Sequence, residues 1–254
     1  MENLLYRIWK YWALLVFAVV GLVFLPPMAL ILIFKHRIAQ NIAILLFRTG
    51  ALLALLLIGI IPIFSGNFKA IKTQSPLVFV ANHRSYLDIL ICLILAPNNS
   101  RFLSKIEVFH WPIVGYFTKR LGHIGVDRSS ARGRAESLEQ ISINLKEGKS
   151  LILFPEGKIL KNTKLLNTFK KGAFLAATRT QSSIVCVAIM NAGIINPCYT
   201  LPKIRPGILR VRFSEPILTK GKGEEATKDL QESAYQWIKS ELKNYHSSGE
   251  YPIK

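Results

Sequence analysis

Two long uncharged runs of apolar residues stand near the start of the chain. Residues 11–34 read YWALLVFAVVGLVFLPPMALILIF, and residues 49–64 read TGALLALLLIGIIPIF. The second run reaches back through Arg48 to about Asn41. As an α-helix, the first run would be roughly 36 Å long, enough to cross the hydrocarbon core of a bilayer. The pattern predicts a hydrophobic helical hairpin that either spans the membrane or dips into one leaflet.

Proline and charged residues add detail to this hairpin. Pro26 and Pro27 argue against one straight helix, because each proline removes a helix hydrogen bond and clashes with the preceding turn. Arg48 lies near the start of the second run, where its long side chain could snorkel to lipid headgroups. A cleaved signal peptide is the alternative for the first run, but no small-residue cleavage site is visible and a second apolar segment follows closely.

From about residue 75 the pattern changes to short buried-strand runs that alternate with helical segments. Strands are expected at 76–82, 122–126, 150–155, 182–189 and 209–217. Helices are expected at 85–95, 109–122, 131–148, 168–180 and 226–245. Such alternation is typical of an α/β fold. The sequence therefore predicts a membrane-associated helical hairpin in residues 1–65 and an α/β domain in residues 66–254.

The net charge of +18 lies mostly outside the hairpin. The first 65 residues hold five Lys or Arg and one acidic residue, which leaves +14 for the rest. This excess favours anionic partners such as lipid headgroups, acidic proteins or nucleic acid. No nucleic-acid-binding motif or interleaving of basic and aromatic residues accompanies it, so we expect no nucleic acid partner. The three cysteines and five histidines lack metal-ligand spacing, and we expect no metal site.

Charge also bears on orientation in the membrane. Arg7 and Lys10 before the first run are balanced by Lys35 and Arg37 after it, so the flanking charges do not fix an orientation. Both ends of a hairpin lie on one side, and the strongly basic domain that follows predicts that this side is cytoplasmic. We expect a protein of the inner or plasma membrane whose α/β domain faces the cytoplasm.

One polar cluster, Asn82 to Asp88, lies where the first predicted strand of the α/β domain turns into a helix. On a continuous helix, the five-residue spacing of His83 and Asp88 would point them about 140° apart. They meet only if His83 lies on the loop and Asp88 on the first helical turn. An imidazole oriented by a carboxylate is a general base for an alcohol. The alternative is a capping box, with Ser85 as N-cap and Asp88 three residues later.

Three further clusters place charged residues at strand or turn ends. Arg128 follows Asp127 after a predicted strand, where its planar fork could bind a phosphate or form a surface ion pair. Glu156 and Gly157 follow another apolar strand, and a carboxylate there could orient a ligand or cap a turn. The segment 104–108, which holds Lys105 and Glu107, is the weakest signal in isolation.

The order and spacing of these clusters resemble the 1-acylglycerol-3-phosphate acyltransferase family of the glycerolipid acyltransferases. The resemblance covers roughly residues 76–192. It combines the segments NHxxxxD (82–88), KxE (105–107), GxIxVDR (122–128), KEGKS (146–150), FPEG (154–157) and FKKGA (169–173). It implies an α/β fold with an acyltransferase-type mixed sheet flanked by helices, preceded by the N-terminal hydrophobic hairpin.

The resemblance also implies a membrane-bound O-acyltransferase that converts 1-acyl-sn-glycerol-3-phosphate into phosphatidic acid. His83 would abstract the hydroxyl proton and Asp88 would hold its tautomer, with no covalent acyl-enzyme. Arg128, the Glu156-Gly157 segment and Lys105 would bind the glycerol phosphate. Acyl-CoA or acyl carrier protein would donate the acyl group as a substrate, with no bound cofactor. Membrane phospholipids and the lysolipid acceptor are the other expected partners.

Two departures from the family pattern concern the acceptor. The third motif usually reads Glu-Gly-Thr-Arg-Ser, but here Lys158-Ile159-Leu160 follows Glu-Gly, so Lys158 offers a point charge without a bidentate clamp. The fourth motif usually contains Val-Pro, replaced here by Val185-Cys186-Val187. Two alternatives therefore stay open: acylation of another lysolipid, and a catalytically inactive membrane-peripheral lipid-binding protein of the same fold. The intact His83 and Asp88 count against the second.

Overall fold

A computed structural model describes residues 4–67, 76–127, 129–159, 164–197 and 204–247 of the chain. The backbone divides into two compact units. The first, called the hairpin unit, comprises Met1–Ile63, Arg84–Asn98 and Asn191–Arg210. The second, called the sheet unit, comprises Phe64–His83, Asn99–Met190 and Val211–Lys254. The predicted domain boundary between residues 65 and 66 stays a prediction.

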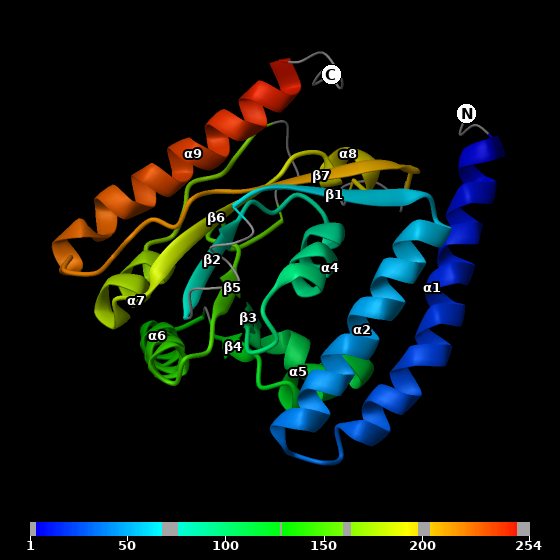
Figure 1. Ribbon diagram of the computed structural model, residues 1–254, viewed down its shortest axis with the longest axis horizontal. Coiled ribbons are helices and arrows are strands. Elements are labelled where there is room, and N and C mark those ends of the chain that lie inside the picture. The colour runs from blue at the N-terminus through cyan, green and yellow to red at the C-terminus, as the bar shows by residue number, and fades with distance from the viewer. Residues whose placement is uncertain (1–3, 68–75, 128, 160–163, 198–203, 248–254) are drawn as a thin grey trace. The chain divides into compact units, whose positions relative to one another are not determined.

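The strands form one seven-stranded mixed sheet with the order β1-β7-β6-β2-β5-β3-β4 (Figure 1). The strands are β1 (Ile60–Gly66), β2 (Leu77–Ala81), β3 (Arg101–Lys105), β4 (Ile124–Val126), β5 (Leu151–Leu153), β6 (Ser183–Ile189) and β7 (Gly207–Phe213). The neighbours from β6 to β4 are parallel, whereas β7 runs antiparallel to β6. The predicted strands are present, although β7 begins and ends earlier than expected. Strands β1 and β3 were not predicted.

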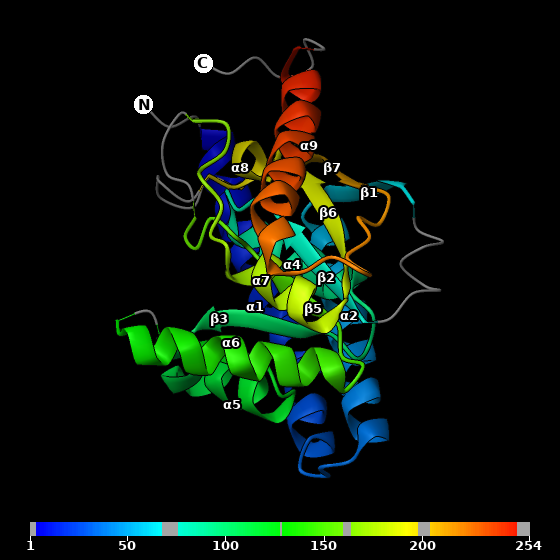
Figure 2. The same ribbon diagram turned by 90° about the vertical axis from the view of Figure 1, so that its left-hand side faces the viewer.

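Three helices of the sheet unit cover one face of the sheet (Figure 2). They are α6 (Ala131–Lys146), α7 (Gly172–Thr180) and α9 (Thr227–Ser247). Alternate residues of the strands point into this core, such as Val78 and Val80 of β2, because successive side chains of a strand face opposite sides. Phe174 of α7 is fully buried in this core. The same unit holds η1 (Ile106–His110), α5 (Pro112–Arg120) and η2 (Glu224–Ala226).

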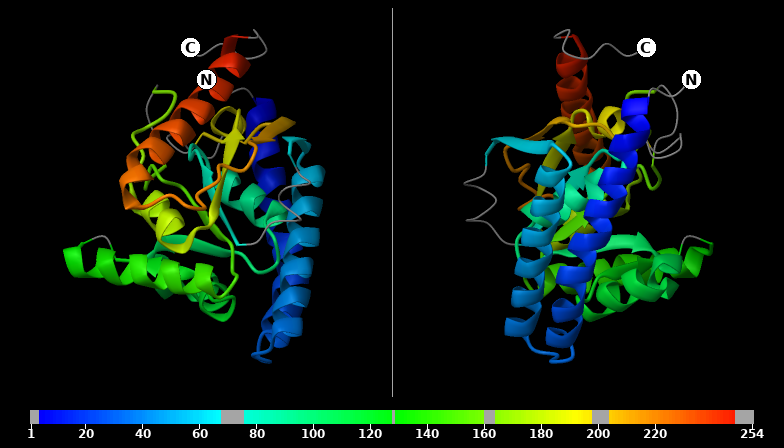
Figure 3. Two further views of the ribbon diagram at one scale, coloured as in Figure 1. Left: turned by 60° about the vertical axis from the view of Figure 1, so that its left-hand side comes forward. Right: turned by 90° about the vertical axis from the view of Figure 1, so that its right-hand side faces the viewer.

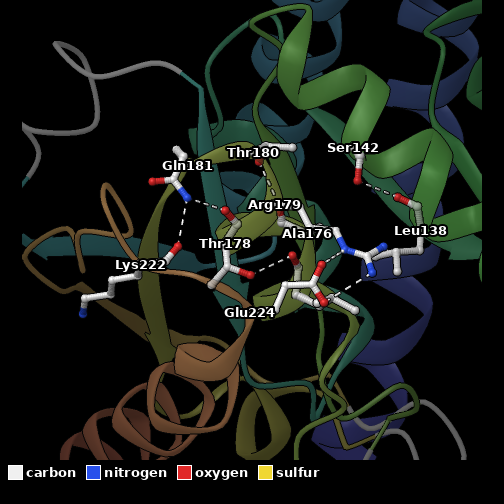
Figure 4. Close-up of polar contacts among 10 residues, drawn as sticks. Leu138, Ser142, Ala176, Thr178, Arg179, Thr180, Gln181, Lys222 and Glu224 are labelled. Carbon is white, nitrogen blue, oxygen red and sulfur yellow. Dashed lines mark hydrogen bonds and ion pairs between the residues drawn. The ribbon is translucent and has the colours of Figure 1, made fainter.

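The end of α7 is fixed by side-chain contacts to a later loop (Figure 4). Gln181 has a left-handed backbone with φ 54° and ends the helix. Its side-chain amide donates to the carbonyl oxygens of Thr178 at 2.6 Å and Lys222 at 3.0 Å. Arg179 pairs with Glu224, with 2.7 Å between Nε and Oε1. These contacts hold the α7 end of the core without involving the candidate site residues.

The hairpin unit contains two long helices, α1 (Leu4–Ile31) and α2 (Arg37–Leu57), which lie side by side (Figure 3). Both are long and apolar enough to cross a membrane. Many large apolar side chains on them are exposed, such as Leu22 at 76%. The indole N–H of Trp12 donates to the Leu57 carbonyl oxygen at 3.0 Å and ties the two helices together. The predicted hydrophobic hairpin is therefore present.

Two details of the hairpin bear on the prediction. Helix α1 includes Pro26 and Pro27 without a break, and the departure from one straight helix at these prolines stays a prediction. Helical hydrogen bonds resume directly after the prolines, with the Leu32 N–H donating to the Met28 carbonyl oxygen at 3.0 Å. Helix α2 ends at Leu57, and the last apolar residues of the second run form β1 instead of helix. A short apolar run fits a buried strand as well as a helix, so periodicity alone could not separate them.

The hairpin unit also contains α4 (Tyr86–Leu95) and the short α8 (Ala192–Ile195). Arg48 of α2 donates to the Leu93 carbonyl oxygen at 3.3 Å, to the Ala96 carbonyl oxygen, and to Oδ1 of Asn98 at 2.6 Å. The last carbonyls of a helix lack partners within the helix, so a guanidinium satisfies them well. The expected snorkelling to headgroups is therefore replaced by capping of α4.

Candidate active site

The predicted catalytic histidine follows the carboxyl end of a central strand. Val80 of β2 is paired in parallel register with Leu153 of β5. His83 and Glu156 each lie three residues beyond this pair, one after each strand. Since parallel strands end at the same edge of a sheet, the register brings the two segments together. In open α/β sheets, this carboxyl edge is where ligands bind.

Asn82 fixes the start of the segment that carries His83. Its side-chain amide donates to the Ile189 carbonyl oxygen at 2.9 Å, and its Oδ1 accepts from the Ile189 N–H at 2.8 Å. Asn82 is fully buried, so both bonds are shielded from water. The amide thus extends the pairing of β2 with β6 beyond Ala81, the last residue of β2. Sequence reasoning placed Asn82 in the motif without assigning it this role.

His83 is held from two sides. Its backbone N–H donates to Oε1 of Glu156 at 2.8 Å. Its ring stacks on the ring of Phe154, with centroids 4.0 Å apart and planes 14° apart. Only 7% of His83 is exposed. The backbone contact and the stacked ring together limit the orientations that the imidazole can take.

Glu156 links two loops through its carboxylate. Besides the His83 N–H, its Oε2 accepts from the Asn167 N–H at 2.9 Å. Gly157 takes a positive φ of 74°, which favours glycine, and its N–H closes the turn onto the Phe154 carbonyl oxygen at 3.0 Å. These contacts make Glu156 a positioning residue for His83. Its predicted direct contact with the substrate stays a prediction.

Asp88 lies on the first turn of α4 and is fully buried. Its Oδ2 accepts from the N–H groups of Arg84 at 2.6 Å and Ser85 at 2.7 Å. Ser85 in turn accepts from the Leu87 N–H at 3.2 Å and donates its hydroxyl to the Asn196 carbonyl oxygen at 2.9 Å. The capping box is therefore present. His83 precedes α4 on a loop and Asp88 lies on the first turn of α4, and the role of Asp88 in orienting the imidazole stays a prediction.

Of the cations predicted to bind the phosphate, Lys105 and Lys158 lie within the described residues and Arg128 does not. Lys105 ends β3, where it is paired with Val126 of β4, and its ammonium contacts Glu107 at 3.0 Å in an exposed ion pair. Lys158 is exposed beside the turn that holds Gly157. Lys105 and Lys158 thus lie at or beyond the carboxyl ends of β3 and β5, and their contact with the phosphate stays a prediction.

Lys170 is a further cation of the site. Its backbone N–H donates to the Pro155 carbonyl oxygen at 2.8 Å. A Cβ added to Gly157 would lie 2.9 Å from the Lys170 ammonium, so this side chain lies against the turn after β5. Sequence reasoning included Lys170 in the FKKGA segment but did not assign it to substrate binding. The lysine pair of that segment was the available signal.

Two titratable groups of the sheet unit, His123 and Asp127, have shifted pKa values. Burial lowers the pKa of His123 to about 3, helped by the charge of Arg101, so its imidazole is neutral at physiological pH. Hydrogen bonds from the Ser129 side chain and backbone lower the pKa of Asp127. Among the residues that the structure describes, no group of three or more His, Cys, Asp or Glu could hold a metal ion. The expectation that no metal is needed stays a prediction.

Comparisons with known proteins cover the region that holds these residues. The sequence profile of the Acyltransferase family matches residues 63–190. A chloroplastic 1-acyl-sn-glycerol-3-phosphate acyltransferase of Arabidopsis thaliana is 33% identical over 164 residues, which are 63% of this chain and 46% of that protein. A lyso-ornithine lipid O-acyltransferase of Pseudomonas aeruginosa is 34% identical over 116 residues, which are 46% of this chain and 43% of that protein. The chain spans about half the length of the curated relatives it matches.

The fold is also found in a solved structure. The crystal structure of the 1-acyl-sn-glycerophosphate acyltransferase of Thermotoga maritima superimposes with a TM-score of 0.78. The match covers 96% of this chain and 98% of that chain, at 21% sequence identity. The predicted α/β fold, with its mixed sheet, flanking helices and N-terminal apolar helices, is thereby confirmed.

Proposed function

We propose that this chain, which belongs to the Acyltransferase family, transfers a fatty acyl group from a thioester to the free hydroxyl of a lysolipid. The observation that carries the proposal is the placement of His83. The backbone N–H of His83 donates to Glu156, and its buried imidazole stacks on Phe154, at the carboxyl ends of the parallel strands. Several named relatives act on 1-acyl-sn-glycerol-3-phosphate. We take this acceptor, and phosphatidic acid as product, as the first candidate.

The reaction proceeds by general-base catalysis. A ring nitrogen of His83 takes the proton of the acceptor hydroxyl while its oxygen attacks the thioester carbonyl. The carbon–sulfur bond then breaks, and the imidazolium returns the proton to the leaving thiolate. Asp88 orients the imidazole and stabilises its cation. Capping of α4 is compatible with this role, because a carboxylate accepts several hydrogen bonds.

The acyl group passes directly to the acceptor, without a covalent acyl-enzyme. A cysteine nucleophile would need a thiolate at working pH. Burial raises the pKa of the Cys186 thiol to about 12, and burial together with the Asp88 charge raises that of Cys92. Cys198 lies outside the described residues. The buried thiols therefore support direct attack.

The glycerol phosphate binds to cations that surround the loop after β5. Lys170 lies against Gly157 in this turn, and Lys158 follows it directly. We include Arg128 and Lys105 in the phosphate site, and we assign the Gly157 backbone a close approach to the acceptor. Since the usual arginine of the third motif is Ile159 here, lysines supply more of the charge than in the family pattern.

The replacement of the usual third-motif arginine by Ile159 also favours a second class of acceptor. Ile159 offers no hydrogen bond to a phosphate, and one relative of this chain is a lyso-ornithine lipid O-acyltransferase. A lysolipid without a phosphate would tolerate the loss of a bidentate guanidinium. In this second proposal, His83 and Asp88 keep their roles and the acceptor headgroup changes.

The acyl donor is acyl-CoA or acyl carrier protein, and the reaction uses no bound cofactor. The apolar helices α1 and α2 support attachment to the membrane that supplies the lysolipid. We assign the α/β domain to the cytoplasmic side of the inner or plasma membrane, where both thioester donors are available.

An acceptor and donor panel tests the proposal. Purified full-length protein is incubated with 1-acyl-sn-glycerol-3-phosphate, other lysophospholipids or lyso-ornithine lipid, each with acyl-CoA or acyl carrier protein thioester. Mass spectrometry identifies the acylated product. Phosphatidic acid as the main product supports the first acceptor, and acylated ornithine lipid supports the second. No acylated product from any pair would refute acyl transfer and favour a catalytically inactive lipid-binding protein.

A further inference from the structure

A run of exposed apolar residues joins η1 to α5 in the sheet unit. Trp111 is 55% exposed, Ile113 61% and Val114 43%, and Pro112 between them is also exposed. We call residues 111–114 the apolar corner. Consecutive exposed apolar residues are costly for a soluble surface and generally mark a binding site. The corner belongs to the sheet unit and is separate in sequence from α1 and α2.

The apolar corner is built on ordered backbone. Trp111 is the N-cap of α5, and its carbonyl oxygen accepts from the Gly115 N–H at 2.8 Å. Pro112 occupies the first turn of α5, where a missing N–H costs nothing. A Cβ added at Gly115 would lie 2.3 Å from the Phe109 carbonyl oxygen, so η1 and α5 approach closely there. The exposed side chains are thus presented by a fixed turn.

Charges around the corner indicate the chemistry of its partner. Lys119 and Arg120 lie in the last turn of α5, and Lys105 precedes η1. The only carboxylate of this segment, Glu107, already pairs with Lys105 at 3.0 Å. An apolar corner that contains tryptophan, with basic residues at the other end of the same short helix, matches the headgroup region of an anionic bilayer. Arg120 and Lys119 can reach phosphates while their stems stay in apolar surroundings.

We propose that the apolar corner inserts into the headgroup layer of an anionic membrane, as a second membrane contact independent of α1 and α2. This goes beyond the proposed function, because it assigns a lipid-binding surface to the sheet unit itself. Trp111 and Ile113 enter the boundary of the acyl chains, and Lys119 and Arg120 bind anionic headgroups. The catalytic unit is thereby brought to the surface on which a lysolipid lies.

A depth measurement on the full chain tests the proposal without using catalysis. In a Cys198→Ser background, Ile113→Cys carries a nitroxide label, while Cys92 and Cys186 are buried. The protein is reconstituted in phosphatidylcholine vesicles that contain phosphatidylglycerol. Power-saturation spectroscopy compares the accessibility of the label to oxygen and to a water-soluble nickel complex. Ser233→Cys on the exposed side of α9, at the other end of the sheet unit from α5 (Figure 2), is the matched control.

The expected result is a several-fold higher ratio of oxygen to nickel accessibility at residue 113 than at residue 233 in these vesicles. Vesicles of phosphatidylcholine alone should lower the ratio at residue 113, because the basic residues then lose their lipid partners. A label at residue 113 that is as accessible to nickel as the control would overturn the proposal. If the label is inaccessible in detergent and light scattering gives a dimeric mass, the corner binds a second copy of this chain, and the membrane proposal is overturned.

A kinetic arm separates this inference from the proposed function. The double variant Trp111→Ser, Ile113→Ser should lower kcat/KM by about tenfold or more for an acceptor embedded in vesicles, because apolar burial is lost. The rate on a short-chain acceptor dissolved in water should stay unchanged. Equal losses on both acceptors would contradict a membrane role for the corner. Failure of wild-type protein to acylate either acceptor would refute the proposed function but leave the depth measurement valid.

Discussion

The carboxylate of Glu156 accepts a hydrogen bond from the backbone N–H of His83, with 2.8 Å between oxygen and nitrogen. Its other oxygen accepts from the Asn167 N–H at 2.9 Å. Glu156 is 3% exposed, so both contacts are shielded from water. Bonds to an ionised acceptor are stronger than neutral ones. One side chain therefore sets the position of the histidine that the proposed mechanism uses as base.

Glu156→Gln tests this positioning role. An amide keeps one acceptor oxygen and places N–H groups where the second oxygen was, so one backbone N–H loses its partner. We expect a loss of roughly 1–3 kcal/mol in the free energy of unfolding. The kcat for acyl transfer should fall about tenfold or more, with a smaller change in acceptor KM, because misplacement of a base weakens the chemical step.

Glu139→Gln is the control for this variant, because it makes the same chemical change at an exposed position of α6. It should leave both stability and kcat near the wild-type values. If Glu156→Gln raised the acceptor KM strongly and left kcat unchanged, Glu156 would instead contact the substrate.

Arg48→Ala removes the cap at the end of α4. The carbonyl oxygens of Leu93 and Ala96 would lose their guanidinium partner. We expect a loss of about 1–3 kcal/mol in stability and a lower kcat, because α4 carries Asp88 on its first turn. Thermal unfolding in detergent and initial rates measure the two effects. Arg37→Ala, an exposed arginine at the start of α2, should change neither, and equal behaviour of the two variants would contradict the capping role.

Phosphate recognition is tested by removing cations singly. Arg128→Ala should raise the KM for 1-acyl-sn-glycerol-3-phosphate by about 30- to 150-fold, the equivalent of roughly 2–3 kcal/mol. Lys170→Ala should raise it by about tenfold, and Lys158→Thr by less, since a mobile point charge binds phosphate less tightly. Lys171→Ala is the control. Unchanged KM in all variants would mean that the acceptor carries no phosphate at this site.

Acid should destabilise the protein through His123. Burial holds its folded-state pKa at about 3, whereas an unfolded histidine titrates near about 6.5. The unfolded chain therefore binds this proton first, and stability falls as pH drops from about 6.5 toward 3. His123→Asn keeps an acceptor for the Phe102 N–H but does not titrate. Between about pH 7 and 4, wild type should lose roughly 1–3 kcal/mol more than the variant. Equal losses of stability in wild type and His123→Asn would contradict this role of His123.

Much of the fold could be predicted because local patterns agree with the final structure. The Val-rich run that became β2 and the amphipathic α6 have the periodicity of their elements. Strand β1 was missed because it continues the apolar run of α2 without a polar break. Strand β3 was missed because it begins with Arg101 and ends with Lys105, charged residues that break the apolar pattern expected of a buried strand.

In the candidate site, contacts between neighbours in sequence could be predicted, whereas contacts between distant residues could not. The capping box of Ser85 and Asp88 joins residues three apart, so the sequence could offer it as one of the two interpretations of the motif. The contact of Glu156 with His83 joins residues 73 apart in the chain. It depends on the register of β2 and β5, which periodicity does not specify. The position of Lys170 beside Gly157 likewise follows from the loop after β5.

The initial rate of acyl transfer by His83→Ala is the decisive measurement for the assignment of His83 as the base. Wild-type and variant protein are reconstituted in the same vesicles, with the acceptor and donor that wild type uses. We expect a loss of at least about 10²-fold in rate, since general-base catalysis is removed. Thermal unfolding and vesicle binding should stay close to wild type. A folded, membrane-bound His83→Ala protein that transfers acyl groups at the wild-type rate would contradict the assignment of His83 as the base.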